Sequence, residues 1–499
     1  MFANFKDSTS PTLENFDVCI IGAGAAGITT ALQLSDAGLR VLLIESGGFE
    51  LDGDTQSLYD GTISGLDYFD LAGTRLRFFG GTTNHWSGQS CRLEPIDFRV
   101  RPWVAGSGWP VAYDDYLSWL PKAVETCRLA FANQFPTDIG PLWETHSEDA
   151  VPDFPLADTD FVPVILRFPV RPFSFGAVYR KSVERSERLL CLLGGNVTRL
   201  ETDPASGTVQ RVHIASLDGK TAVARASRYV LATGAIENAR LLLASGPGTK
   251  LGEGPGIGNR RDLVGRYFME HPNHDASLVS IDEEAGYLHT PKRRALPNMM
   301  RLDFRLKPEV QEKLEILNHS AFLRPHFSQD LVEKIWNKVV VHSLGLASQD
   351  MTLRVRLEQA PRAQNRITLT EETDSLGLPM PHLHLEMGEI ETKTVAAVHE
   401  SFARALGMTS AGRMRVDFDA TNESWMSQVD YQYHHLGGTR MASTPATGVV
   451  DPDCRVFESP NLFIAGSSIF PTGGHANPTM NLLAFAHRMA DQIRRELKP

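Results

Sequence analysis

Two polar residues near the C-terminal end of the chain have types and surroundings that suit proton transfer. His435 lies in segment 433–441 (Tyr-His-His-Leu-Gly-Gly-Thr-Arg-Met), and Asn477 lies in segment 476–479 (Ala-Asn-Pro-Thr). A neutral imidazole can accept a proton near neutral pH, because an unperturbed histidine titrates near ~6.5. An asparagine amide can donate hydrogen bonds and stays uncharged at every pH. Together they could hold one hydroxyl group, remove its proton and orient the neighbouring C–H bond.

Two further histidines accompany this pair. His434 precedes His435 and should point away from it in an extended segment, so we expect a structural role. His475, two residues before Asn477, is expected to be a solvated loop histidine, with a contact to substrate or cofactor as the alternative. The glycines after His435 and the Asn-Pro turn favour His435 as the catalytic base, and a histidine tied to the backbone is the other interpretation.

The elements around a glycine-rich turn near the N-terminus predict a nucleotide-binding unit. Residues 17–21 are apolar and β-branched and predict a buried parallel strand. Residues 25–37 predict an alanine-rich helix, and residues 40–44 predict a second buried strand. A strand, a turn, a helix and a strand in this order form a right-handed crossover unit, whose helix begins where phosphates bind.

The residues of this turn have separate expected functions. Gly22 permits the tight turn, Gly24 lets the backbone approach a pyrophosphate, and Gly27 lets the helix pack closely on the strand. Glu45, at the end of the second strand, would accept hydrogen bonds from a ribose diol. The glycines alone do not separate FAD from NAD. Their position at the extreme N-terminus, with a late strand and turn at 230–234, favours a flavoprotein.

Charge and composition exclude several classes of partner. The formal net charge is −11, and the chain has no run of Lys and Arg of the kind that nucleic acid or anionic membranes require. No apolar run approaches the ~18 residues of a spanning helix, and the N-terminus shows no signal-peptide pattern. The 5 cysteines are scattered without metal-binding spacing, which fits a reduced compartment. We therefore expect a cytoplasmic protein with a small-molecule substrate, no metal, and neither nucleic acid nor membrane as partner.

Hydropathy patterns divide the chain into two kinds of region. Residues 186–232 predict a run of strands, and residues 235–245 predict a helix. The middle of the chain, within 276–386, alternates in the manner of strands. Residues 389–406 predict an amphipathic helix that ends at Gly407.

These patterns predict an α/β nucleotide-binding domain with a Rossmann-like parallel sheet, into which an α+β substrate-binding domain is inserted. The expected first domain is discontinuous and comprises residues 1–100, 186–275 and 430–499. The expected substrate-binding domain comprises residues 101–185 and 276–429.

Motifs along the whole chain resemble the glucose–methanol–choline (GMC) family of FAD-dependent alcohol oxidoreductases. They are the glycine turn with Glu45, the loop 80–86 (Gly-Gly-Thr-Thr-Asn-His-Trp), 230–243, 264–267 before His271-Pro272, 358–369 and the C-terminal block 433–488. Within the family, the segments of His435 and Asn477 look most like the pyranose 2-oxidase branch. Thr439 and Arg440 depart from that branch, since an intervening residue is lacking. The resemblance implies a flavin-binding fold and a substrate domain with a large, mainly antiparallel sheet backed by helices.

The resemblance also implies roles for individual residues. It implies oxidation of an alcohol carbon by hydride transfer to the N5 atom of FAD, with His435 as base and Asn477 as its partner. His85 holds the place of the histidine that attaches flavin covalently in some branches, and a non-covalent contact is the alternative. Ser87 is expected near flavin N5. Further expected contacts with the cofactor are Gly81, Trp86, Val197, Gly466 and Ser467.

The expected function is oxidation of an alcohol group on a sugar, glycoside or aminosugar, with O₂ or another small molecule as electron acceptor. Oxidation of simple aliphatic or aryl alcohols is an alternative, as is a non-redox FAD lyase of the same family. A non-catalytic nucleotide-binding scaffold is a third alternative, and the pair His435 and Asn477 disfavours it.

Overall fold

A computed structural model gives the architecture of the chain. It describes residues 1–7, 12–129, 156, 158–169, 173–246, 254–281, 293–295, 298–325, 349–416, 418–419 and 423–498. The sequence also predicts helical patterning over Tyr113–Phe131, and the last two residues of that range lie outside the described residues.

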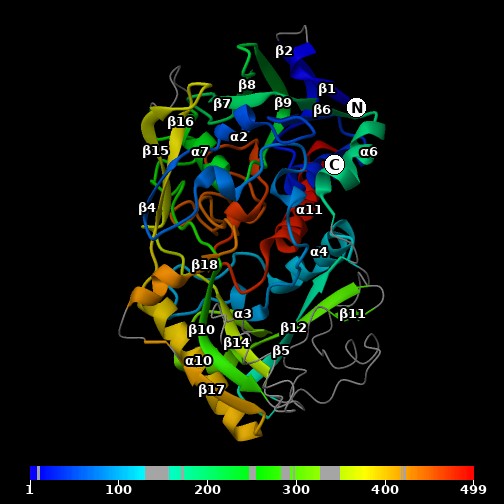
Figure 1. The fold of residues 1–499 in the computed structure, drawn as a ribbon. Coiled ribbons are helices and arrows are strands. Elements are labelled where there is room, and N and C mark those ends of the chain that lie inside the picture. The colour runs from blue at the N-terminus through cyan, green and yellow to red at the C-terminus, as the bar shows by residue number, and fades with distance from the viewer. Residues whose placement is uncertain are drawn as a thin grey trace.

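One eight-stranded sheet organises the half of the molecule that contains both chain ends (Figure 1). Its strands are β1 (Phe2–Asn4), β2 (Thr12–Ile21), β3 (Val41–Glu45), β6 (Leu189–Leu193), β7 (Asn196–Thr202), β8 (Val209–Ala215), β9 (Thr221–Leu231) and β19 (Leu462–Ile464). The order is β1-β6-β3-β2-β9-β8-β7, with β19 paired to β9. The pairs β1–β6, β6–β3, β3–β2, β2–β9 and β9–β19 are parallel. The pairs β9–β8 and β8–β7 are antiparallel. The predicted parallel sheet is confirmed.

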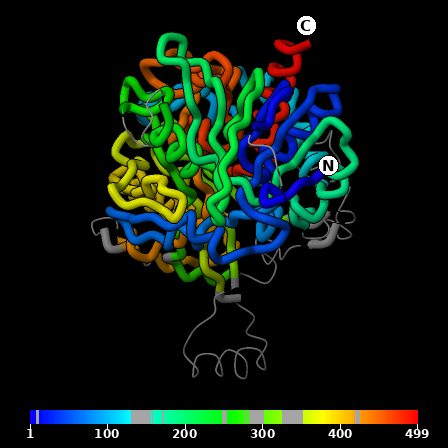
Figure 2. Tube along the Cα trace, turned by 90° about the horizontal axis from the view of Figure 1, so that it is seen from above, coloured from blue at the N-terminus to red at the C-terminus, as the bar shows by residue number. Residues whose placement is uncertain are grey.

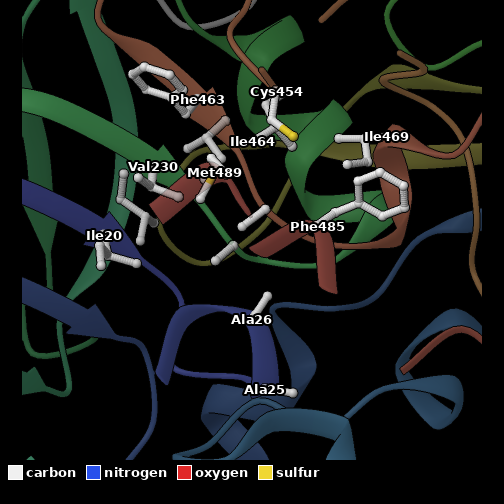
Figure 3. Close-up of a cluster of buried hydrophobic side chains, with 14 of the residues drawn as sticks. Ile20, Ala25, Ala26, Val230, Cys454, Phe463, Ile464, Ile469, Phe485 and Met489 are labelled. Carbon is white, nitrogen blue, oxygen red and sulfur yellow. The ribbon is translucent and has the colours of Figure 1, made fainter. Parts of the chain in front are cut away.

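Helices from distant parts of the chain pack on this sheet, either directly or through one another. They are α1 (Ala25–Asp36), α4 (Tyr113–Thr126), α6 (Phe175–Arg185), α7 (Ala235–Ala244) and α11 (Pro478–Leu497). α11 packs against both α1 and α4, so the C-terminal helix lies beside the first helix of the chain, and blue and red segments are neighbours in Figure 2. Figure 3 shows part of the buried core between these layers, where Met489 of α11 lies near Val230 and Ile464 of the sheet and Phe485 of α11 lies near Ile469. Burial of these apolar side chains holds the two ends of the chain together.

A second sheet forms the other half of the molecule (Figure 1). Its strands are β5 (Phe161–Phe168), β10 (Pro272–Ile281), β11 (Arg293–Ala295), β12 (Asn298–Leu306), β13 (His319–Pro325), β14 (Gln349–Leu357), β17 (Gly412–Val416) and β18 (Asp430–Tyr431). Every pairing in this sheet is antiparallel. The helix α10 (Glu389–Thr409) packs on β14 and β17 through buried residues such as Val398 and Phe402. The predicted antiparallel sheet backed by a helix is confirmed.

Shorter elements complete the described fold. A three-stranded sheet of β4 (Thr62–Gly65), β16 (Pro379–Leu385) and β15 (Arg366–Thr373) packs against α7. The short helices are α2 (Gly53–Ser57), α3 (Pro95–Phe98) and α8 (Pro308–Leu314). Among the described segments, no helix combines the length and the apolar composition that crossing a membrane requires.

The predicted end of α10 is wrong. The helix continues through Gly407 to Thr409, and Ser410 takes the left-handed conformation with φ 57° that ends it. A glycine inside a helix costs only about 1 kcal/mol relative to alanine. The buried face of the helix, which includes Ala405 and Leu406, outweighs this cost, and the chain turns only when β17 begins.

The glycine turn between β2 and α1 contains two glycines that the fold itself requires. Gly22 has φ +99°, and a Cβ atom there would lie 2.6 Å from the carbonyl oxygen of Ala232. A Cβ atom on Gly27 would lie 1.9 Å from the carbonyl oxygen of Gly22. Gly24 differs, because its φ is −79° and a Cβ atom there would meet nothing within 4 Å. The protein alone therefore has room for a side chain at position 24 but not at position 27.

This difference predicts that two alanine substitutions affect stability differently. Gly27→Ala forces a methyl group against backbone that cannot move aside, so we expect a loss of at least about 1–3 kcal/mol in the free energy of unfolding. Gly24→Ala is the matched control and should leave stability unchanged. The measurement is the urea midpoint of cofactor-free protein, so that ligand binding does not contribute. Equal midpoints for the two variants would show that the close packing at Gly27 is wrong.

Candidate active site

A cavity of about 500 Å³ lies where the parallel strands β2, β3, β9 and β19 end. Its lining includes residues that follow each of these strands, such as Gly22, Ala232 and Gly466. The carboxyl edge of a parallel sheet is where such folds bind cofactors. The predicted site residues that line this one cavity are Gly22, Gly24, Glu45, Gly81, His85, Trp86, Ser87, Val197, His435, Gly466, Ser467 and Asn477. Gly27 lies beneath the turn instead, as its packing function requires.

The glycine turn offers the cavity an open, electropositive wall. α1 begins at Ala25, directly after Gly24, so its first backbone N–H groups and the positive end of its dipole meet the cavity. Cβ atoms at Gly24 and Gly466 would meet no protein atom within 4 Å. The loop at Gly80 is fixed to this turn, because its backbone N–H donates to the carbonyl of Ala23 at 2.8 Å. The open space and the donors fit the pyrophosphate of a dinucleotide.

Glu45 has a structural function that the sequence did not reveal. Its Oε2 accepts a hydrogen bond from the backbone N–H of Ala23 at 2.7 Å, and its Oε1 accepts one from Gly47 at 3.1 Å. Burial raises the pKa of this carboxyl, while the two backbone N–H groups oppose the shift. The carboxylate thus holds the glycine turn in place, and its remaining lone pairs can still accept bonds from ribose hydroxyls.

The loop after Gly81 presents three predicted contacts to the cavity. His85 is exposed there, its imidazole has no hydrogen-bond partner among the described residues, and partial burial lowers its pKa. Trp86 is anchored, because its Nε1–H donates to the carbonyl of Phe173 at 2.8 Å and its ring packs edge-on against Phe173. Ser87 is exposed to the cavity. The arrangement leaves the imidazole of His85 free to react or to contact a cofactor.

His434 and Asn477 belong to a buried chain of hydrogen bonds. The Nε2 atom of His271 lies 2.9 Å from the carbonyl oxygen of Gly474, so this nitrogen carries the proton, and its Nδ1 must accept. The Nδ1 atom of His434, 2.9 Å away, is therefore the donor to His271. Its Nε2 atom then accepts from the Nδ2 of Asn477 at 3.2 Å, while Arg356 donates to the Oδ1 of Asn477 at 3.0 Å.

Burial keeps this chain uncharged at its histidines. Desolvation, together with the charge of Arg356, lowers the pKa of His271 to about 4 and that of His434 well below its usual range. Both ring nitrogens of His434 are occupied, so it cannot also serve as a base. It acts as a positioning residue for Asn477, whose amide keeps one N–H for another partner.

His435 points to a different group of residues. Its Nε2 lies 2.9 Å from the hydroxyl of Tyr68, which donates to the Oε1 of Glu270 at 2.7 Å. Its Nδ1 has no hydrogen-bond partner among the described residues. Burial, aided by the charge of Arg75, lowers the pKa of His435 to about 3, so the ring is neutral at physiological pH. Ser467 donates to the carbonyl of His435 at 2.6 Å and fixes its backbone.

The structure places the predicted pair in one cavity but not in direct contact. Asn477 bonds to His434, whereas His435 bonds to Tyr68. Tyr433 has a φ of 57°, so the chain turns just before the two histidines. The expectation that His434 points away from His435 is confirmed, although the segment is not simply extended.

His475 differs from its prediction. It is 1% exposed, it is absent from the cavity lining, and its Nε2 has no partner among the described residues. Its burial and the nearby charge of Arg305 lower its pKa well below the usual range. The prediction of a solvated loop histidine is wrong, because the turn before α11 is enclosed by the second half of the molecule, which includes Arg305 and His319.

Sequence reasoning missed Tyr68, Glu270 and Arg356. Glu270 precedes the His271-Pro272 pair of the family motif, which is a signal that could have identified it. Tyr68 lies in a loop after β4 with no motif around it, so only the folded structure brings it to His435.

Two family models match the chain in the segments that build this site. Residues 361–486 match the model described as "GMC oxidoreductase", and residues 17–116 match "FAD dependent oxidoreductase". The chain is 24% identical to the fructose dehydrogenase large subunit of Gluconobacter japonicus over 97% of this chain and 98% of that protein. It is also 24% identical to 2-methyl-1,2-propanediol dehydrogenase of Mycolicibacterium austroafricanum, over 96% of this chain and 95% of that protein. It is 23% identical to paromamine 6'-oxidase of Streptomyces fradiae over 97% and 92% of the two chains.

Solved structures share the fold over nearly the whole length. Formate oxidase matches with a TM-score of 0.63 and 16% identity, covering 98% of this chain and 100% of that one. Pyridoxine 4-oxidase from Mesorbium loti matches with a TM-score of 0.62 and 19% identity, covering 96% and 99%. These neighbours do not single out the pyranose 2-oxidase branch. The two family models and the full-length relatives agree, and the chain is similar along its whole length to the GMC-family FAD-dependent oxidoreductases.

Proposed function

We propose that the protein oxidises an alcohol group to a carbonyl, with His435 accepting the hydroxyl proton. The observation that supports this most strongly is the state of its imidazole. His435 lines the cavity, is neutral, and keeps one ring nitrogen without a partner among the described residues. Both nitrogens of His434 are engaged, and His475 lies outside the cavity lining. Among these three histidines, His435 is the one able to act as a general base.

Asn477 is the proposed donor to the alcohol oxygen. The guanidinium of Arg356 can only donate, so the atom of Asn477 that faces it is the carbonyl oxygen. The NH₂ group of Asn477 therefore faces the other way, with one N–H directed to His434 and the second available. A fixed neutral donor stabilises the oxygen as it loses its proton.

The cofactor would be held by the groups already described at the cavity wall. The turn at Gly22 and Gly24 and the backbone at Gly466 suit the pyrophosphate, Glu45 suits the ribose, and the loop at 81–87 lies where the flavin ring is expected. When bound, FAD supplies the acceptor for the hydride of the alcohol carbon. We also propose that residues 1–100, 186–275 and 430–499 form the FAD-binding domain and that residues 101–185 and 276–429 bind substrate.

A sugar, glycoside or aminosugar is the proposed substrate. Relatives named fructose dehydrogenase, paromamine 6'-oxidase and C-glycoside 3-oxidase support a carbohydrate alcohol, as does the resemblance of segment 433–441 to the pyranose 2-oxidase branch. The name 2-methyl-1,2-propanediol dehydrogenase favours the alternative of a simple alcohol. Relatives are named both oxidases and dehydrogenases, so O₂ and another small acceptor both remain candidates.

Replacement of His435 tests the proposed base. His435→Ala should retain FAD but reduce it about 10²–10⁴-fold more slowly, because the hydroxyl proton loses its acceptor. Asn477→Ala should slow reduction about 10²–10³-fold, by analogy with removal of one oxyanion donor. The measurement is anaerobic stopped-flow flavin reduction with the best alcohol from a carbohydrate panel.

The neighbouring histidine, His434, provides the matched control. His434→Ala should resemble Asn477→Ala, since it releases that amide without removing the base.

Because the pKa of His435 is about 3, its own titration should cause no change in the rate of flavin reduction between pH 5 and 9. The imidazole itself becomes positively charged only as the pH falls toward that value. If His435→Ala reduces its flavin at the wild-type rate, the base is a different residue.

Substitution of Gly24 tests the cofactor site. Gly24→Val should leave the fold intact, because nothing in the protein opposes a side chain there, but its methyl groups would fill the space of the pyrophosphate. We expect the purified variant to lose most of its flavin, measured as the ratio of flavin to protein absorbance. Gly48→Val is the control, since Gly48 is exposed and, like Gly24, open to a Cβ, but it does not line the cavity. Full flavin occupancy in Gly24→Val would show that the turn has been misinterpreted.

Acid denaturation tests covalent attachment at His85. We propose that a nitrogen of this exposed, unpartnered imidazole would bond to the 8α carbon of the flavin in place of one C–H bond; the two electrons released would pass to the flavin ring and then to the same small electron acceptor that serves alcohol oxidation. Yellow colour and the added flavin mass should stay with the acid-precipitated protein, and His85→Ala should release FAD to the supernatant. Free FAD from the wild-type protein would limit His85 to a non-covalent contact.

A further inference from the structure

Glu270 and Tyr68 form a buried connection to His435 from the side away from the cavity. Tyr68 donates to Glu270 at 2.7 Å and lies 2.9 Å from the Nε2 of His435, while Glu270 is 3.9 Å from that nitrogen. Glu270 is fully buried, and neither it nor Tyr68 lines the cavity. Neither residue has a role in the proton transfer proposed above for His435 and Asn477.

The protons of this connection can be counted when Glu270 is ionised. Tyr68 has a single O–H, and the carboxylate of Glu270 can only accept, so this proton points to Glu270. The oxygen of Tyr68 must then accept from His435, which places the imidazole proton on Nε2. The Nδ1 atom of His435 therefore carries a lone pair and can accept a proton.

The opposite arrangement holds when Glu270 is protonated. Its O–H then donates to the oxygen of Tyr68, and the O–H of Tyr68 donates to the Nε2 of His435. The imidazole remains neutral, but its proton is on Nδ1, which can no longer accept one. The added proton is balanced by this relay: one proton enters at Nδ1, the Nε2 proton moves to Tyr68, and the Tyr68 proton moves to Glu270.

We propose that Glu270, acting through Tyr68, is a positioning residue that sets the tautomer of His435 and thereby makes its Nδ1 the base. This inference rests on the proposed function, because it assigns the nitrogen that takes the alcohol proton. Through the same relay, the proton taken from the alcohol can pass from His435 to Glu270. The site stays free of a buried imidazolium, whose desolvation is costly.

The surroundings of Glu270 support a change of protonation near neutral pH. Desolvation raises its pKa to about 7, against hydrogen bonds from Tyr68 and from the backbone N–H groups of His271, His434 and Gln432. The N–H of His271 bonds the Oε2 atom at 2.8 Å, and the backbone N–H of Glu270 itself donates to the Oε1 of Gln359.

The other titratable groups around this connection keep their charge states through neutral pH. Burial lowers the pKa of His271 to about 4 and that of His435 to about 3, and it lowers the pKa of His434 well below its usual range. Burial also raises the pKa values of Tyr68 and Tyr431. The charge of Arg75 acts on Tyr68 and His435, and that of Asp67 acts on Tyr431. Glu270 is thus the group whose titration changes the tautomer.

The pH dependence follows with a definite sign. Only the ionised form of Glu270 leaves Nδ1 able to accept, so the rate of flavin reduction should rise with pH through about 7. Glu270→Gln should abolish this limb and hold the rate at its low value. The backbone N–H of His271 retains the amide oxygen, so the NH₂ group faces Tyr68 and imitates the protonated acid. A wrong tautomer can cost up to about 10⁴-fold in rate, and we expect a loss of about 10²–10⁴-fold.

A second variant and a control complete the kinetic test. Tyr68→Phe should also remove the limb, because Glu270 no longer reaches His435. Tyr431→Phe is the matched control, since its ring contacts Tyr68 at 4.9 Å but its hydroxyl has no partner among the described residues. It should keep the wild-type rate and limb. FAD content should be unchanged in all three variants.

A spectroscopic measurement reads the tautomer directly. In ¹⁵N-histidine-labelled holoenzyme, with the His435 signal assigned by His435→Gln, Nδ1 should be unprotonated at pH 9 and protonated at pH 6. In Glu270→Gln it should be protonated at both pH values. If that variant does not fold, Tyr68→Phe serves instead and should lose the pH-dependent exchange of signals.

The outcomes separate this inference from the proposed function. Wild-type flavin reduction by His435→Ala would overturn the base itself. A slow His435→Ala, combined with a wild-type limb and wild-type ¹⁵N signals in Glu270→Gln or Tyr68→Phe, would overturn only the tautomer assignment. The tautomer assignment would be supported if, in these variants, the rate of flavin reduction no longer rises with pH and the Nδ1 signal of His435 no longer changes with pH.

Discussion

The parallel pairing of β2, β9 and β19 is the constraint on which the whole site depends. Ile21 and Leu231 stand in register, and Leu231 pairs in turn with Ile464. The chain therefore leaves the sheet at three neighbouring points, although these residues are hundreds of positions apart. The glycine turn after β2, the turn after β9 and the segment after β19 form one wall of the cavity. Every proposed function of His435 and Asn477 follows from this convergence.

Desolvation then determines which groups in the site carry charge. The histidines around the cavity are neutral because burial disfavours their protonated forms, and their hydrogen bonds are directed rather than ionic. Glu270 is the exception, because burial and its donors oppose each other and leave its pKa near neutrality. A proton removed from an alcohol can then be held without a permanent buried charge.

The sequence was sufficient for the parts of the site that depend on local pattern. The glycine turn and Glu45 were predicted because each needs a particular residue at a fixed distance from a strand or helix, whereas the loop at His85 was identified through its resemblance to the GMC family. The second sheet and α10 followed from periodicity, apart from the end of that helix at Thr409 rather than Gly407.

The remaining features depend on tertiary contacts that spacing does not encode. Tyr433 takes a positive φ and separates His434 from His435. Tyr68 and Arg356 reach the site from strands and loops far away in sequence, and His475 is buried by the other half of the molecule. The state of the imidazole of His435 could be deduced only after its partners were known.

The most direct test of the central claim is anaerobic mixing of the FAD-containing protein with sugars, glycosides, aminosugars and simple alcohols, while the flavin absorbance is followed. We expect at least one alcohol to bleach the flavin, whereas the matching deoxy compound, which lacks the reacting hydroxyl, should leave it oxidised. A flavin that dithionite reduces normally but that stays oxidised with every alcohol would contradict it.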